Sequence, residues 1–357
     1  MKEKIAFIAV GQGGGNIGKL IESKGYKVLY LNTSQEDLDT LKDVKFKHHI
    51  KNGEGCNHDR LKAKKLVASD FEAIFEETEK LEADILMVIF ATGGGTGSGG
   101  GPMLMDLLLG EGKTVGSIPI LPGKDESVKA HMNSYECFKE LLAIDDSGAM
   151  FPIDNNQGKK LTLNQKFVDP FCAFLNIPNQ HKHIKGNIDK AEIVETLSAH
   201  GMAYVFQFDS KIAEAIEHFK NNIFAPAEMD GVVKYITLSA MDESLNLEPF
   251  EKVVGVPLDR FQTYNTKKSI CCLSGLSFPK TRFDELYEKI NTHKDNIVKN
   301  LNHNTEFRLD KDIDFLSGVT AAGSKRQEVV KTAESGAQKS KEEKRAVSRK
   351  SILDKYL

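Results

Sequence analysis

The sequence has 357 residues, of which 40% are hydrophobic and 28% are charged, and its formal net charge is −3. That composition is ordinary for a globular protein, and no apolar run approaches the roughly 20 residues that a membrane span needs. The six apolar residues from Ile5 to Val10 are too few for the core of a secretory signal. We therefore expect a cytoplasmic protein that does not enter the membrane.

Three further features narrow the class of protein. The length exceeds what one hydrophobic core usually fills, so we expect two domains. The five cysteines show neither CxxC spacing nor histidine neighbours at zinc-ligand spacing, which predicts reduced thiols rather than a metal site. Residues 321–357 contain ten Lys and Arg residues against five Asp and Glu residues, so a basic tail follows an acidic body.

The first half of the chain alternates short β-branched runs with longer amphipathic stretches. Strands are predicted at 5–10, 28–31, 85–91, 115–121 and 150–153, and helices at 16–23, 60–81, 103–109 and 127–143. This alternation predicts an α/β fold with a mainly parallel sheet covered by helices. A long central helix is predicted over 161–185, with Pro170 tolerated only in its first turn.

The second half of the chain has a different order and spacing of predicted strands and helices. Strands are predicted at 202–208, 232–239 and 269–277, and helices at 211–222, 248–254 and 281–301. We therefore expect a first domain over 1–160, the central helix over 161–185 and a smaller α/β domain over 186–317. Residues 318–357 are rich in Lys, Glu, Ser and Ala, a composition that predicts a flexible tail.

A glycine-rich segment, residues 91–102, directly follows a predicted strand and precedes a predicted helix. Its glycines leave successive backbone N–H groups free to surround an anion at a helix N-terminus, and Thr96 and Ser98 add hydroxyl donors. A flexible linker is the alternative. It fits poorly because linkers do not connect a buried strand to a helix.

A second glycine cluster, residues 11–19, also lies between a strand and a helix. It satisfies the dinucleotide pattern GxGxxG, and it nearly satisfies the P-loop pattern, which fails at Leu20 where a hydroxyl residue is required. The dinucleotide interpretation expects an acidic residue about 20 positions further on, where the chain has Asn32, Thr33 and Ser34. An NAD-dependent oxidoreductase therefore stays an alternative, although it leaves the segment 91–102 without a role.

Two anion-binding loops in one domain imply a ligand with several phosphates. The pair GQGGGN and GGGTGSG resembles the GxGGxGN and GGGTGTG loops of the tubulin/FtsZ superfamily, with Ser98 in place of a threonine. This resemblance implies a GTPase that binds GTP or GDP with Mg²⁺. The implied nucleotide contacts in these loops and in the loop after the second strand are Gly11, Gln12, Gly13, Gly14, Asn16, Asn32, Gly93, Gly94, Gly95, Thr96, Gly97 and Ser98.

The resemblance continues along the chain. Residues 53–57 are similar to the loop beside the γ-phosphate, and Glu126 matches a ribose-contacting glutamate, although an ordinary acid at a helix N-terminus is the alternative. The resemblance places Asn155 and Asp169 at the guanine, whose two adjacent donors a carboxylate accepts best. Asp169 as an ordinary N-terminal helix acid is again the alternative.

The segment Gly186–Glu192 resembles the loop that completes the GTPase site of a neighbouring subunit. By this resemblance Asn187, Asp189 and Glu192 are catalytic, whereas the alternative makes Asp189 a helix N-cap. The implied protein is a head-to-tail filament, and its basic tail resembles the plasmid- and phage-partitioning TubZ tubulins. That likeness implies DNA segregation, with a DNA-bound adaptor protein as the tail's partner and only weak direct DNA contact. The alternatives are an FtsZ-like division protein and a non-hydrolysing scaffold.

Overall fold

The computed structural model describes residues 1–180, 186–264, 266–301 and 341–357. Its strands are β1 (Ile5–Val10), β2 (Lys27–Asn32), β3 (Phe46–His49), β4 (Ile85–Ala91), β5 (Thr114–Leu121), β6 (Ala149–Met150), β7 (Ile153–Asp154), β8 (Gly201–Phe208), β9 (Tyr235–Ala240), β10 (Asp259–Tyr264) and β11 (Ser269–Leu276). One sheet runs through both halves of the chain, in the order β10-β9-β11-β8-β6-β5-β4-β1-β2-β3, and β7 pairs with β5. The predicted α/β fold with a mainly parallel sheet is confirmed.

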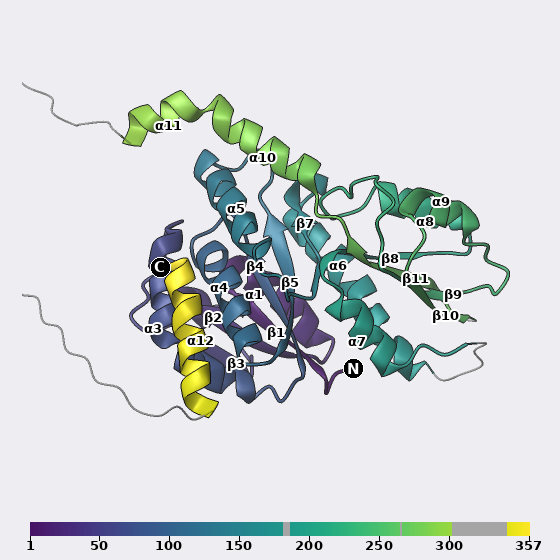
Figure 1. The fold of residues 1–357 in the computed structure, drawn as a ribbon, viewed down its shortest axis with the longest axis horizontal. Helices are drawn as coiled ribbons and strands as arrows, with labels where there is room; N and C mark the ends of the chain where they lie inside the picture. Colours follow the sequence, from purple (N-terminus) through teal and green to yellow (C-terminus); the bar gives the residue numbers. More distant parts are fainter. Residues whose placement is uncertain (181–185, 265, 302–340) are drawn as a thin grey trace, which may run out of the picture.

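Helices cover both faces of this sheet (Figure 1). They are α1 (Gly11–Ser23), α2 (Gln35–Asp39), α3 (Arg60–Glu79), α4 (Thr96–Gly110), α5 (Val128–Leu141), α6 (Lys160–Leu175), α7 (Lys190–Ser198), α8 (Ile212–Lys220), α9 (Glu248–Val254), α10 (Lys280–Thr292), α11 (Lys294–Leu301) and α12 (Lys341–Tyr356). Among the described residues, no helix is both long and apolar enough to cross a membrane.

The side chains of β1 show that each face of the sheet is covered by its own hydrophobic core. Phe7 points into a core that also contains Ile17 of α1 and Phe171 of α6. Ile8, on the opposite face, packs in a second core with Val67 of α3 and other residues of α3 and α4. Alternation with a period of two therefore buries both faces of the strand, as a central parallel strand requires.

The direction of the strands determines where a ligand can bind. β1 pairs in parallel with β2 and β4, and β4 pairs in parallel with β5, so the carboxyl ends of these four strands meet at one edge of the sheet. The second half joins the same sheet where β8 pairs in parallel with β6, through Ala149 opposite Gly201. The carboxyl edge of an open α/β sheet is where such folds bind ligands.

The central helix differs from the prediction in length and in its proline. α6 ends at Leu175 and is followed by a 3-10 turn at Ile177–Asn179, because Pro178 has no N–H group with which to continue the helix. Pro170 lies in the interior of α6 rather than in its first turn. The carbonyl of Lys166 that Pro170 leaves without a helical partner belongs to an exposed residue, so water can reach this side of the helix.

The two glycine clusters are more helical than predicted. α1 begins at Gly11 rather than at Asn16, and α4 begins at Thr96 rather than at Met103. The sequence also gave no sign of α2, β3 or β10. The early starts matter for binding, because they place the free N–H groups of two helix N-termini at the carboxyl ends of β1 and β4.

The last part of the predicted flexible tail is a helix that packs on the body. Residues 302–340 lie outside the described residues, but 341–357 contain α12, which lies along α4 (Figure 1). The guanidinium of Arg349 pairs with Glu72 and Glu111 and lies 5.5 Å from the ring centre of Phe71. In the described structure residues 341–357 are thus held against the body, and the flexibility predicted for 318–357 stays a prediction.

The opposite end of α12 is also fixed to α4. Lys355 Nζ lies 2.9 Å from Asp106 Oδ2, and the hydroxyl of Tyr356 donates to the same carboxylate at 3.2 Å. The ring of Tyr356 is buried in the core of α3, α4 and α5, and this burial raises the pKa of its hydroxyl. An acidic face of the body thus matches a basic helix that carries apolar anchors.

We expect Arg349→Ala to weaken the docking of α12. The side chain of Glu111 is 1% exposed and would lose its cation, which is costly for a buried carboxylate. Amide hydrogen exchange in α12 should become roughly tenfold faster. Lys350→Ala is the matched control, because it removes the same charge from the neighbouring, exposed position. Equal exchange in the two variants would contradict this role of Arg349.

Candidate nucleotide-binding site

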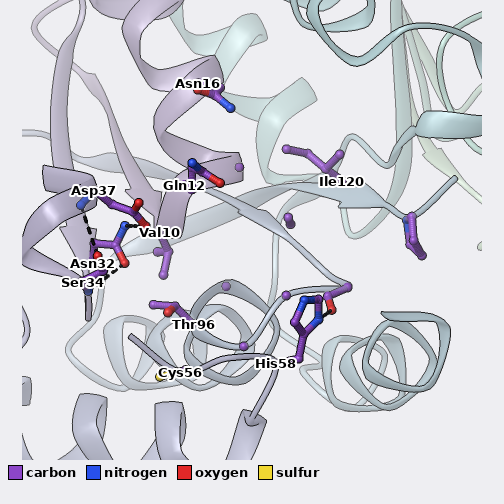
Figure 2. Close-up of a pocket in the computed structure, with 18 of the residues that line it drawn as sticks. Val10, Gln12, Asn16, Asn32, Ser34, Asp37, Cys56, His58, Thr96 and Ile120 are labelled. Atoms are coloured by element: carbon purple, nitrogen blue, oxygen red, sulfur yellow. Dashed lines mark hydrogen bonds between the residues drawn. The ribbon is translucent and has the colours of Figure 1, made fainter. Parts of the chain in front are cut away.

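A cavity of about 520 Å³ opens at the carboxyl edge of the sheet, beyond β1, β2, β4 and β5. Its volume lies within the range of small-molecule sites. Twelve of the residues predicted to contact nucleotide line it: Gly11, Gln12, Gly13, Asn16, Asn32, Gly93, Gly94, Gly95, Thr96, Gly97, Glu126 and Asn155. The two glycine loops, 80 residues apart in sequence, thus face one space, and Figure 2 shows Gln12 and Thr96 on opposite sides of it.

The glycine-rich segment forms the floor of the cavity at the start of α4. A Cβ atom added to Gly94 would meet no other heavy atom within 4 Å, so this backbone is open to the cavity. Gly95 instead backs onto the neighbouring loop, where an added Cβ would lie 2.7 Å from Cys56 Cβ. Thr96 begins α4, and its hydroxyl lies 2.7 Å from that of Thr33. Free N–H groups at a helix N-terminus make this floor suited to phosphate.

Two predicted contacts in the glycine loops do not line the cavity. The hydroxyl of Ser98 is buried and donates to the carbonyl of Gly94, one helical turn earlier. A Cβ on Gly14 would overlap the carbonyl oxygen of Ile89, so this glycine permits the close packing of α1 on β4. Both predictions are corrected: the two residues shape the loops without facing the ligand space.

The loop before α3 closes one side of the floor. Asn57 and His58 adopt positive φ angles of 40° and 60°, and Nδ1 of His58 lies 2.9 Å from the carbonyl oxygen of Gly93 (Figure 2). The amide of Asn133, on α5, donates to the carbonyls of His58 at 3.0 Å and of Gly93 at 3.2 Å. Asn133 therefore holds the loop against the phosphate floor. Residues 53–57 were predicted here by resemblance, but His58 was missed.

A polar wall lies between β5, β7 and α6. Oε1 of Glu126 accepts from the amide nitrogen of Gly123 at 3.1 Å and from Asn155 Nδ2 at 3.4 Å, and Lys160 Nζ lies 3.0 Å away. Burial raises the pKa of Glu126, but Lys160 and the two hydrogen bonds outweigh it, so the net pKa is below the usual value. The N-cap of α5 is Ser127, so Glu126 is not the capping residue of that helix.

The structure does not support Asp169 as a guanine contact. Its carboxylate pairs with Lys24, the residue after α1, at 2.8 Å and lines a separate cavity of about 410 Å³ between α6, β8 and α8. Two residues of α6 reach the nucleotide cavity: Lys160, at its start, and Asn164, which is 6% exposed. Asn164 was missed because the sequence does not show which face of α6 turns toward the cavity. Asp37 and Lys160 also line the cavity and were not predicted.

We expect Asn164→Leu to weaken nucleotide binding by roughly tenfold, because a buried amide next to the ligand space would lose its hydrogen bonds to the ligand. Leucine preserves the approximate volume of the side chain. Titration of a fluorescent guanine nucleotide would measure the change, and Gln165→Leu, an exposed neighbour outside this cavity, is the control. Unchanged affinity in Asn164→Leu would remove this residue from the site.

The predicted catalytic residues lie at the opposite edge of the sheet. α7 lies beside the start of the chain (Figure 1), where burial and the positive charge of Lys190 lower the pKa of the N-terminal amine. β1 begins at Ile5, so Asp189 lies at the amino edge. The six residues of β1 span about 20 Å, so Asp189 and Glu192 do not share a cavity with the glycine loops of the same chain.

The local geometry of these carboxylates is a capping box. Oδ1 of Asp189 accepts from the backbone N–H of Glu192 at 3.1 Å, and Oε2 of Glu192 accepts from the N–H of Asp189 at 2.7 Å. The alternative of Asp189 as an N-cap is therefore correct as a description of its contacts. Asp189 and Asn187 are nevertheless exposed at this edge, so a second molecule can reach them.

No group of three or more His, Cys, Asp and Glu side chains among the described residues could hold a metal ion by itself. The five cysteines are all buried free thiols, in agreement with the sequence.

Comparisons with known proteins agree with the cavity and the fold. A model of the tubulin/FtsZ family GTPase domain matches residues 4–162. The chain is 32% identical over 303 residues to the tubulin-like protein TubZ of Clostridium botulinum C phage, covering 81% of this chain and 84% of that protein. The chain belongs to the tubulin/FtsZ family. The predicted resemblance to this GTP-binding family is thereby confirmed.

Solved structures of tubulin/FtsZ proteins have the same fold. TubZ of Clostridium botulinum phage c-st matches with a TM-score of 0.75 and 29% identity, over 83% of this chain and all of that one. A GTPγS-bound protofilament of CetZ2 from Haloferax volcanii matches with a TM-score of 0.66 over 82% of this chain and 99% of that one, at 19% identity. The second likeness shows the fold alone. Membership of this GTPase family also fits a cavity with a phosphate floor at one end and a polar wall at the other.

Proposed function

We propose that the protein is a GTPase that assembles head to tail into filaments, and that each GTPase site is completed by the next subunit. One observation supports this most: the nucleotide cavity lies at the carboxyl edge of the sheet, and the exposed Asp189 and Asn187 lie at the amino edge. One chain cannot bring these edges together. Stacking joins two different surfaces, which gives an open filament instead of a closed dimer.

The residues present fit a nucleotide with Mg²⁺. The open backbone at Gly94 accommodates phosphate oxygens, and Asp37 supplies a carboxylate in the cavity, which is the kind of ligand that Mg²⁺ takes together with phosphates and water. When bound, the cation would neutralise charge on the phosphates. Glu126, Asn155 and Asn164 form the wall for ribose and base.

The incoming subunit would supply the carboxylates that act on water. Burial raises the pKa of Glu192, and the neighbouring charges of Asp189, Asp259 and Glu195 raise it further. A raised pKa makes this carboxylate a better proton acceptor near neutral pH. Asp189 and Glu192 would then orient the attacking water, while the N–H groups of the glycine floor stabilise charge on the phosphates.

Two other functions make different predictions. A non-hydrolysing scaffold is favoured by the capping box, and in such a protein Asp189 and Glu192 would have only that structural role. An NAD-dependent oxidoreductase would use the loop after β1 but not the open floor at Gly94.

The proposed GTPase is tested by measuring phosphate release over a range of protein concentrations, with negative-stain microscopy in GTP, GDP and a slowly hydrolysed analogue. Release per subunit that does not rise with concentration would contradict a site shared between subunits.

We further propose that the filament segregates plasmid or phage DNA through an adaptor protein that binds the basic tail. The likeness to phage TubZ supports this role, and so does the basic composition of 321–357. Ile352, Leu353 and Tyr356, which would anchor the adaptor, pack against the body in the described structure. Adaptor capture would therefore require α12 to leave α4. A truncation after residue 320 should preserve GTP-dependent filaments and eliminate capture of adaptor-bound DNA; full capture by the truncated protein would contradict the role of the tail.

A further inference from the structure

A buried arginine from the C-terminal half lies directly behind the polar wall of the nucleotide cavity. Arg282 is in the first turn of α10, and it is 4% exposed. Its Nε donates to Asp154 Oδ2 at 2.7 Å, and its Nη2 donates to the carbonyl oxygen of Pro122 at 3.0 Å. Asp154 is 1% exposed, so this ion pair is shielded from water. Neither residue was singled out by the sequence.

Each hydrogen-bond partner of Arg282 is connected, through a further hydrogen bond or through the next residue of the chain, to a residue of the polar wall. Asp154 accepts from the backbone N–H of Asn156 at 3.0 Å and so caps the 3-10 turn that begins with Asn155. Pro122 itself lines the cavity and precedes Gly123, whose N–H donates to Glu126. One guanidinium thus holds both segments that present Asn155 and Glu126. A planar group with donors in two directions suits this task, and a lysine does not match it.

We propose that Arg282 is a positioning residue for the ribose and base of the bound nucleotide, and that it couples occupancy of the cavity to the docking of α10. This proposal rests on the proposed binding of GTP. The phosphate floor at 93–97 belongs to other segments, and the hydrogen bonds of Arg282 go instead to Asp154, Glu285 and the carbonyl of Pro122. Losing Arg282 should therefore weaken contacts to the nucleoside and leave contacts to the phosphates unchanged.

The coupling has to operate in both directions. If the position of α10 affects nucleotide affinity, bound nucleotide must stabilise the docking of α10 to the same extent. α10 is followed directly by α11. Arg282 therefore connects α10 to the nucleotide cavity through the side chain of Asp154 and the carbonyl of Pro122.

The chain offers a matched control for general damage to α10. Phe283, the next residue, packs on Phe138 of α5 with ring centres 4.7 Å apart. Phe283→Ala should lower the stability of the protein while Arg282 keeps α10 docked, so Asn155 and Glu126 should not move. Arg282→Met removes the guanidinium but leaves Asp154 buried without a cation. The double variant Arg282→Met with Asp154→Leu removes both charges and keeps the test usable if the single variant does not fold.

The experiment uses the full-length chain and two probes, GTP and inorganic triphosphate. We expect Arg282→Met and the double variant to bind GTP roughly tenfold more weakly, with triphosphate affinity unchanged, and Phe283→Ala to retain GTP affinity. Added GTP should slow hydrogen exchange in α10 of the wild type but not of Arg282→Met. Unchanged GTP affinity, equal losses for both probes, or an equal loss in Phe283→Ala would each overturn the proposal. Wild-type protein that binds no GTP would instead contradict the proposed function.

Discussion

Gly94→Val should abolish nucleotide binding while the protein stays folded. The backbone at Gly94 faces the cavity, and an added Cβ meets no protein atom within 4 Å, so the valine side chain would occupy only the space intended for phosphate oxygens. Affinity for GTP should fall by more than about a hundredfold, since the phosphate contacts at a helix N-terminus cannot form around a branched side chain. Isothermal titration with GTP measures this loss directly.

Two comparisons make the Gly94 result specific. Gly15→Ala changes a glycine inside α1 whose added Cβ would meet only the ring of Tyr30 at 4.0 Å, and it should bind GTP normally. Gly95→Val is expected to lose binding and stability together, because its side chain would overlap Cys56 and the backbone of His58. Normal GTP affinity in Gly94→Val would show that the phosphates lie elsewhere.

The second large effect concerns the carboxylates at the amino edge. Glu192→Gln and Asp189→Asn should slow GTP turnover by about a hundredfold, the scale of losing a group that acts on the water. GTP binding and assembly should change little, and filaments should therefore persist longer. These substitutions suit the question better than alanine, because glutamine and asparagine can still make the capping-box hydrogen bonds that begin α7.

The melting temperature of these variants distinguishes catalysis from capping. Glu192→Ala removes the capping bond and should lower stability by about 1 kcal/mol, whereas Glu192→Gln should not. Glu76→Gln, at an exposed position of α3, is the charge-matched control. Normal turnover in Glu192→Gln and Asp189→Asn, with intact filaments, would leave these residues with a capping role alone.

Sequence reasoning succeeded where the signal is local. Alternating apolar runs predict strands through their period, and glycines between a strand and a helix predict anion-binding turns, so most lining residues of the two loops were identified. The prediction that Asp169 contacts the guanine placed this residue on the wrong face of α6. It lies five residues after Asn164 on α6, which rotates it by roughly 140° around the helix. Packing of Phe167 and Phe171 into the core decides which of the two faces the cavity.

His58 and Arg282 were missed because their roles depend on tertiary contacts. His58 acquires its place through the carbonyl of Gly93, and Arg282 through residues about 130 and 160 positions earlier in the chain. The helix α12, in contrast, could have been predicted from the spacing of its residues. Arg349, Ile352, Leu353 and Tyr356 follow the i, i+3, i+4, i+7 spacing of one helix face, which the surrounding Lys and Glu residues obscured.

The continuous sheet also determines how a subunit would carry load. In a filament of the proposed geometry, one neighbour contacts the carboxyl ends of β1, β4 and β5, and the other contacts the amino edge near Asp189. Tension along the filament would then run parallel to these strands. The hydrogen bonds between parallel strands lie across that direction, so the whole ladder would be sheared at once instead of being opened one bond at a time. Such a subunit resists being pulled apart along the axis on which it would move its cargo.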